Sequence, residues 1–136
     1  MDYINCIYAL IICSSANEIA KVVLPFLNNH PASKEGFKYS IHDDGDNLFI
    51  DFTNKWKTEL YFMESDNKWY NMHLSNEVSD ITNINCSNEF IRKIGFDLMK
   101  VFDKHNIIYR FEITKELEDG SIHDEEYFFH PDFPND

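Results

Sequence analysis

Hydrophobic and polar positions follow two different periods along this chain, and the period changes several times. Residues 3–12 are almost continuously apolar and rich in β-branched and aromatic side chains, which predicts a strand buried on both faces. Between residues 37 and 74, strand-like runs alternate with turn-forming stretches, of which residues 43–47 are the clearest hairpin turn. The simplest interpretation of this region is a meander of four antiparallel strands.

Two segments have the period of an amphipathic helix. The first begins at about Ala16, because Ser15 and Glu18 have the spacing of a capping box. Pro25 must kink this helix or confine it to the preceding residues, since proline cannot donate the hydrogen bond that a helix interior requires. The polar stretch 28–31 is expected to end it.

The second helix is predicted after a polar loop at residues 75–85, with Ser87 as its capping residue. Its apolar stripe consists of Ile91, Ile94, Leu98, Val101 and Phe102. Residues at this spacing lie on one helix face, so we expect the stripe to be part of the core. His105 and Asn106 are a plausible stop.

Two further strands complete the predicted fold. Odd-numbered positions in 107–113 are apolar and the alternating positions are mostly polar, and residues 122–129 are expected to pair with that strand across a turn at 118–120. The element order β-α-β-β-β-β-α-β-β predicts an α+β fold. It comprises a single curved, mostly antiparallel sheet with two helices packed on one face.

Length and composition predict one domain over residues 1–136, with residues 130–136 as a frayed acidic tail. The 136 residues are 43% hydrophobic and 15% aromatic, which is ample for a packed core. The apolar segment 3–12 is too short to span a bilayer and lacks a basic flank. The odd number of cysteines predicts reduced, mostly buried thiols and a cytoplasmic protein. These cysteines are Cys6, Cys13 and Cys86.

The formal net charge of -12 opposes direct binding to nucleic acids or anionic membranes and favours a basic protein as partner. The charge is uneven. Residues 116–136 hold eight carboxylates and no Lys or Arg. Carboxylates attract and orient a cationic partner, whereas aromatic rings supply contact area that loses water on binding. This segment contains both, so it is the first candidate for a binding surface.

The candidate partner-binding residues form two groups. The first comprises Asp119, Asp124, Glu125, Glu126, Tyr127 and Phe129. The second comprises Asp43, Asp44, Asp46 and Trp56. In both groups acids are predicted to steer a basic partner and aromatic rings to anchor it. The structural alternatives are a solvated acidic terminus and a tryptophan ring that folds over the end of the sheet.

No catalytic, metal or cofactor signature is present, and we predict a protein without enzymatic activity. The four glycines are scattered, and residues 42–47 lack the spacing of a calcium loop. His123 lies beside three acids, but alternate strand residues face opposite sides, so Glu125 shares its face and Asp124 and Glu126 do not. An exposed acidic strand is therefore favoured over a site for chemistry.

A short acidic α/β chain rich in Asn, Ile, Phe and Tyr resembles the immunity proteins of bacterial contact-dependent inhibition and related polymorphic-toxin systems. The resemblance rests on the sequence ELEDGSIHDEEYFFHPDF at 116–133 and on DDGD at 43–46. It implies a cytoplasmic inhibitor that binds a basic cognate toxin, often a nuclease, and blocks its active site or a surface beside it. We predict no cofactor.

Three other functions stay open. A nucleic-acid mimic of the anti-restriction or anti-CRISPR type would space its acids regularly over the surface, whereas one compact acidic and aromatic patch favours a toxin partner. A small metal-dependent hydrolase would need a cleft that joins His123, Asp124 and Glu126. A structural or adaptor subunit would present an exposed sheet edge.

Overall fold

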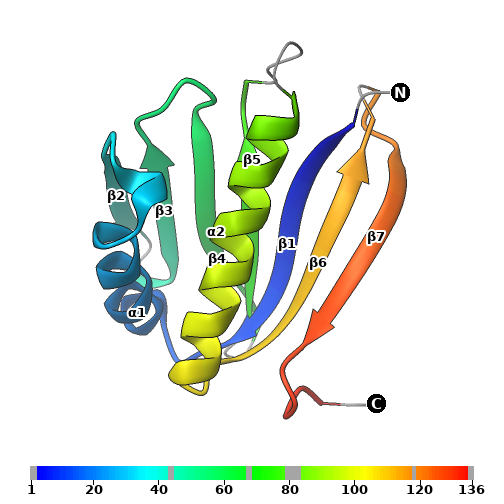
Figure 1. Ribbon diagram of the computed structural model, residues 1–136. Helices are drawn as coiled ribbons and strands as arrows, with labels where there is room; N and C mark the ends of the chain where they lie inside the picture. Colours follow the sequence, from blue (N-terminus) through cyan, green and yellow to red (C-terminus); the bar gives the residue numbers. More distant parts are fainter. Residues whose placement is uncertain (1–2, 43–44, 67–68, 79–83, 118, 135–136) are drawn as a thin grey trace.

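A computed structural model describes residues 3–42, 45–66, 69–78, 84–117 and 119–134. Its elements are β1 (Ile4–Ile12), α1 (Ala16–Asn28), the 3-10 turn η1 (Pro31–Ser33), β2 (Phe37–His42), β3 (Asn47–Phe52), β4 (Thr58–Asp66), β5 (Trp69–Asn76), α2 (Ile84–Lys104), β6 (Ile108–Glu116) and β7 (Ile122–Phe129). This order confirms the predicted α+β fold. Figure 1 shows both helices on the same side of one open sheet, as the sequence predicted.

The sheet has seven strands in the order β2-β3-β4-β5-β1-β6-β7, and every neighbouring pair is antiparallel. The predicted meander is confirmed as β2 to β5. β1 lies inside the sheet between β5 and β6, so α1 carries the chain from an interior strand to the edge at β2. α2 carries it back past β1 to β6. The acidic strand β7 forms the other edge (Figure 1).

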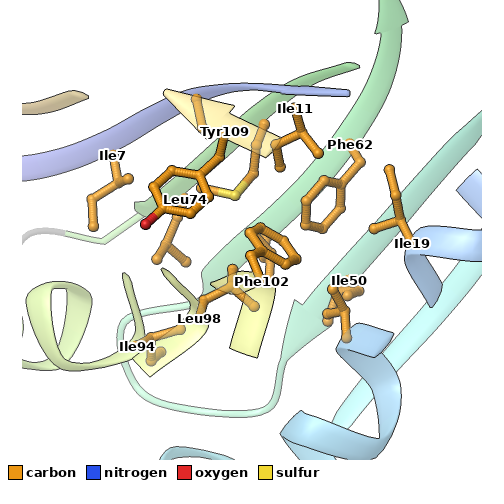
Figure 2. Packing of buried hydrophobic residues seen from close by; sticks show 14 of the residues in the cluster. Ile7, Ile11, Ile19, Ile50, Phe62, Leu74, Ile94, Leu98, Phe102 and Tyr109 are labelled. Atoms are coloured by element: carbon orange, nitrogen blue, oxygen red, sulfur yellow. The ribbon is translucent and has the colours of Figure 1, made fainter. Parts of the chain in front are cut away.

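The core lies between the sheet and the helices. α2 lies over β1, β5 and β6, whereas α1 lies over β3 and β4. The predicted helix stripe is confirmed at Ile91, Ile94, Leu98 and Phe102, which are fully buried. The predicted face of β6 is confirmed as well, since Tyr109, Phe111 and Ile113 are buried. On β5 the buried side chains are Tyr70, Met72 and Leu74. Figure 2 shows Phe102 near the middle of this cluster.

The prediction that β1 is buried on both faces is wrong. Ile7 and Ile11 face the helices and are fully buried, but Tyr8 on the opposite face is 36% exposed and Leu10 is half-buried. Both helices cover the same side of the sheet, and within the described residues no helix covers the other side. Continuous apolarity in β1 therefore reflects one core face and one mixed face, on which Cys6 is buried, Tyr8 is exposed and Leu10 is half-buried.

The two helix boundaries differ from the sequence prediction in different ways. α1 continues through Pro25 and ends at Asn28, where the polar stretch was expected to end it. α2 is already helical at Ile84, so Ser87 lies inside the helix, is buried, and donates its hydroxyl hydrogen to the Ile84 carbonyl at 2.9 Å. The prediction of Ser87 as the cap is therefore wrong.

Residues 130–133, which follow β7, are held by hydrogen bonds where fraying was expected. His130 is buried, and its backbone N–H donates to the Tyr109 carbonyl at 3.0 Å. The Asp132 N–H donates to His130 Nδ1 at 3.0 Å, and the Phe133 N–H donates to the His130 carbonyl at 2.9 Å. These bonds turn the chain back towards the sheet.

We expect Gly95→Ala to destabilise the protein although alanine favours helices. A methyl group at Gly95, which lies in α2 against β1, would overlap the Cδ1 atom of the fully buried Ile7. Overpacking costs about 1–3 kcal/mol, whereas the gain in helix propensity is about 1 kcal/mol. Denaturant unfolding should show a net loss. In an Ile7→Val background, which lacks Cδ1, the same substitution should be neutral or stabilising; an equal loss in both backgrounds would contradict the packing.

Candidate functional site: the open face of the sheet

The candidate site is the face of the sheet that the helices do not cover, here called the open face. Cross-strand partners on this face form a row that runs through β3, β4, β5, β1, β6 and β7. The row consists of Phe49, Tyr61, His73, Tyr8, Glu112 and Tyr127. Five of its six members have rings. Most exposed aromatic surface of a folded domain is scattered, so a continuous row marks a candidate contact surface.

Contacts between neighbours hold the rings of this row in place. The Tyr8 and His73 rings stack with centroids 4.7 Å apart and an interplanar angle of 21°. The Tyr61 hydroxyl lies 2.6 Å from His73 Nδ1, and the Phe49 and Tyr61 centroids are 5.9 Å apart. Burial lowers the pKa of His73, which favours the neutral ring. The middle of the open face is therefore an ordered aromatic surface.

Carboxylates follow the aromatic row on β6. Glu116 accepts hydrogen bonds from the Tyr8 hydroxyl at 3.0 Å and from the Thr114 hydroxyl at 2.8 Å. Glu112 lies between Tyr8 and Tyr127 in the strand register, and the Tyr127 hydroxyl donates to it at 3.4 Å. Hollows of about 320 and 230 Å³ lie beside Glu112, and both are also lined by Tyr8. Carboxylates of β6 therefore lie beside both the aromatic rings and the hollows of the open face.

The electrostatics around Glu112 disfavour its ionised form. Burial raises the pKa of Glu112, and a hydrogen bond with the Glu125 carboxyl and its charge raise it further. The Tyr127 hydroxyl and the charge of Arg110 oppose this shift without cancelling it. The hydrogen bond between Tyr127 and Glu125 raises the pKa of Tyr127 to about 12. A cation placed at this point would relieve the repulsion between the two carboxyls.

An aromatic corner lies at the end of β7. Phe129 is 56% exposed, and its ring lies 6.4 Å from Tyr127 and 5.7 Å from Phe133. The chain turn after β7 brings Phe133 to 5.7 Å from Trp69 on β5. Arg110 lies over the Phe133 ring at 5.9 Å. The corner extends the open face with apolar area that is accessible to a partner.

The structure divides the predicted C-terminal binding residues between two faces. Glu125, Tyr127 and Phe129 lie on the open face, in register with β6 residues that also face it. Glu126 faces the helices and forms an ion pair with Arg92 of α2 at 2.8 Å. Asp119 lies in the turn before β7 and accepts hydrogen bonds from the Ser121 N–H at 2.9 Å and the Ser121 hydroxyl at 2.6 Å.

The acids at 119, 124, 125 and 126 therefore do not form one surface. Asp124 shares the helix side with Glu126, as the strand alternation predicted. Of the set that a hydrolase would require, Asp124 and Glu126 share this side, whereas His123 lies at a register shift between β6 and β7 and has no partner in the strand register. Within the described residues, no group of three or more His, Cys, Asp or Glu side chains could hold a metal ion. Neither described helix is long and apolar enough to cross a membrane.

Trp56, from the second predicted group, does not lie on the open face. Trp56 is half-buried on the helix side, where its ring lies 5.1 Å from that of Phe90 in α2. The ring therefore folds over the end of the sheet. Asp46 lies at the start of β3 beside Glu64, whose pKa its charge raises. Asp43 and Asp44 lie outside the described residues.

Sequence reasoning missed the central members of the site, above all Tyr8, His73 and Glu112. Their strands were predicted, but the sequence does not say that His73 and Glu112 are the cross-strand neighbours of Tyr8. The available signal was the face of β5 opposite Tyr70 and Met72, which carries Trp69 and His73. Cys86 is exposed rather than buried, and only Cys6 of the three thiols is fully buried.

We expect Glu112→Gln to stabilise the free protein at neutral pH. The folded-state pKa of Glu112 lies above the ordinary value of 4.5, so the folded state binds more protons than the unfolded state just above that pH. Stability is therefore lost as pH rises from 4.5 through the folded pKa. In urea at pH 7 the variant should have the larger free energy of unfolding, and its difference from the wild type should shrink towards pH 4. A variant less stable than the wild type at pH 7 would contradict the repulsion between Glu112 and Glu125.

Comparisons of this chain with protein-family models, with curated proteins and with solved structures give no match, so the function of the open face has to be argued from its own geometry.

Proposed function

We propose that this chain is an inhibitor that binds a basic protein through the open face, as an immunity protein neutralises a cognate toxin in the cytoplasm. The observation that carries the proposal is the row of ordered rings that leads into the carboxylates of β6 and β7. Two functions are combined in it. The acids provide attraction and orientation, and the rings provide area that loses water in the complex.

Charge complementarity argues for a basic partner. The free protein holds Glu112 and Glu125 close enough to raise the pKa of Glu112. An ammonium or guanidinium group from a partner would stabilise both ionised carboxyls at once, and a bidentate arginine fits such a pair best. The net charge of -12 adds long-range attraction for any basic surface.

Order in the free protein argues for tight binding. The Tyr8 ring is stacked on His73 and its hydroxyl is bonded to Glu116, so little side-chain freedom is left to lose on association. Immobilising a side chain costs about 0.5–1.5 kcal/mol, and a surface that is already ordered avoids part of this cost. Exposed Tyr127 and Phe129 are the candidate anchors.

A nuclease toxin fits this chemistry because it must present lysines and arginines to bind phosphates. The open face would then cover the substrate-binding surface or a neighbouring basic surface. A nucleic-acid mimic is the second candidate. It is favoured by acids outside the aromatic row, since Glu59 on β4 lies close enough to Asp51 and Glu77 for their charges to raise its pKa.

The proposal is tested by capture of proteins from native lysate on three immobilised baits. These are the wild type, an open-face variant with Glu112→Gln, Glu125→Gln and Phe129→Ala, and a control with Glu18→Gln, Glu89→Gln and Tyr39→Ala. The control loses the same charge and one exposed ring elsewhere. A basic protein retained by the wild type and the control, and lost from the open-face variant, is the expected result.

The captured protein must then be inhibited by an equimolar amount of the wild type. If it is a nuclease, its cleavage of DNA or RNA provides the assay. Equal retention on all three baits, or retention of acidic proteins only, would overturn the assignment of the open face. Retention of several unrelated nucleic-acid-binding proteins on the wild-type bait would favour the nucleic-acid mimic instead.

A further inference from the structure

A second concave site lies on the helix-covered side of the sheet, away from the open face. It is a cavity of about 540 Å³ between η1, the turn that joins β3 to β4, and the first half of α2. Figure 1 shows these three segments towards the end of the sheet where β3 and β4 are joined. Its apolar walls are Pro31, Ala32, Trp56 and Phe90.

The cavity has a fixed shape because hydrogen bonds join its walls. His30 Nδ1 accepts the Ala32 N–H at 3.0 Å, which places the hydrogen of the neutral ring on Nε2. His30 Nε2 lies 2.7 Å from the Asp97 carboxylate and donates to it, so η1 is tied to α2. On the other side, the Asn54 side chain accepts the Thr58 N–H at 3.1 Å and holds the turn that carries Trp56.

Positive charge gathers at this cavity although the chain as a whole is strongly acidic. Lys34, Lys55 and Lys93 line it with a single acid, Glu35. The Lys55 ammonium lies 5.1 Å from the centre of the Trp56 ring, and Lys93 forms an ion pair with Asp97 at 3.0 Å. A second cavity is also lined by three lysines and one acid, but it contains no tryptophan. Lysines combined with the Trp56 and Phe90 rings therefore give the present site its chemical preference.

We infer that this cavity binds a small organic anion with a flat apolar body, of the aromatic carboxylate class. The apolar walls would cover the ring system, and the lysine ammonium groups would hold the carboxylate at the rim. This division between an apolar interior and a few convergent polar groups is typical of small-molecule sites. Trp56 is a wall of this site.

The test uses 2-naphthoate as the probe and its neutral amide as the matched ligand, with ¹H–¹⁵N NMR of the full chain. The two tryptophan indole N–H signals report different places, because Trp56 lines the cavity and Trp69 lies on the open face. Saturable 2-naphthoate binding should shift the Trp56 signal and leave that of Trp69 in place. We expect the amide to bind about tenfold more weakly, since it lacks the charge that the lysines attract.

Variants separate this site from general binding of an anion to the protein. Lys34→Gln with Lys55→Gln should weaken 2-naphthoate binding about threefold or more, as expected for partly exposed charges. The control, Lys38→Gln with Lys115→Gln, makes the same charge change on β2 and β6 and should bind as the wild type does. Trp56→Phe keeps an apolar wall and should still bind.

Three results would overturn the inference. These are no saturable binding at millimolar probe, equal affinity for the amide, and shifts at Trp69 in place of Trp56. Unchanged thermal midpoints of the variants show that the fold is intact. Because the cavity and the open face lie on opposite sides of the sheet, failure here leaves the binding of a basic protein unaffected.

Discussion

Truncation of Phe102 to alanine is expected to lower the free energy of unfolding by about 3–5 kcal/mol, the range for a large side chain removed from a packed core. Phe102 is fully buried, and its ring lies 6.1 Å from that of Phe111 on β6 and 6.4 Å from that of Tyr109. Figure 2 shows it between α2 and the sheet. Its removal would leave a cavity at the contact that joins α2 to the strands.

The matched control for this prediction is Phe129→Ala, which removes the same side chain from the open face. Phe129 is 56% exposed. Its ring stacks on Tyr127 and makes an edge contact with Phe133 at the surface. We expect a loss below about 1 kcal/mol, as for most surface substitutions. Urea unfolding of both variants decides the matter. Similar losses would show that Phe102 is not the centre of the core or that Phe129 is structurally required.

The fold was accessible from the sequence because the core side of each element has a strong period. In β6, Tyr109, Phe111 and Ile113 alternate with polar residues, and in α2 Ile91, Ile94 and Leu98 recur at helical spacing. Burial selects apolar side chains at those positions, so the pattern and the structure have one cause. Boundaries were less predictable: Ser87 has the chemistry of a cap, but the helix begins before it.

The site was only partly accessible, because it depends on the order and register of the strands. Tyr127 and Phe129 were found because they follow one another in an acidic segment. Tyr8 and Glu112 are more than 100 residues apart in the chain and become neighbours only when β1 pairs with β6. No local pattern indicates that this face stays uncovered. The same missing information made β1 look buried on both sides.

The last prediction separates attraction from anchoring on the open face, with the captured partner in a kinetic binding experiment. Glu112→Gln with Glu125→Gln should slow association and flatten its dependence on salt, because these acids contribute long-range attraction that salt screens. Glu18→Gln with Glu89→Gln makes the same change in net charge at residues of α1 and α2. Its effect on association should be smaller, since steering falls off over about 10 Å at 0.1 M salt.

Truncation of an anchor should act on dissociation instead. Phe129→Ala is expected to raise the dissociation rate about tenfold or more, since a loss of 1.4 kcal/mol corresponds to a factor of ten and anchors exceed this. Tyr39→Ala, which removes a ring of 55% exposure from β2, should leave both rates unchanged. Glu112→Gln alone should weaken the complex while it stabilises the free protein, because the partner no longer finds the repelling pair that it would neutralise. A variant that gains stability and keeps full affinity would show that Glu112 lies outside the interface. The proposed role of the open-face carboxylates in binding would then be contradicted.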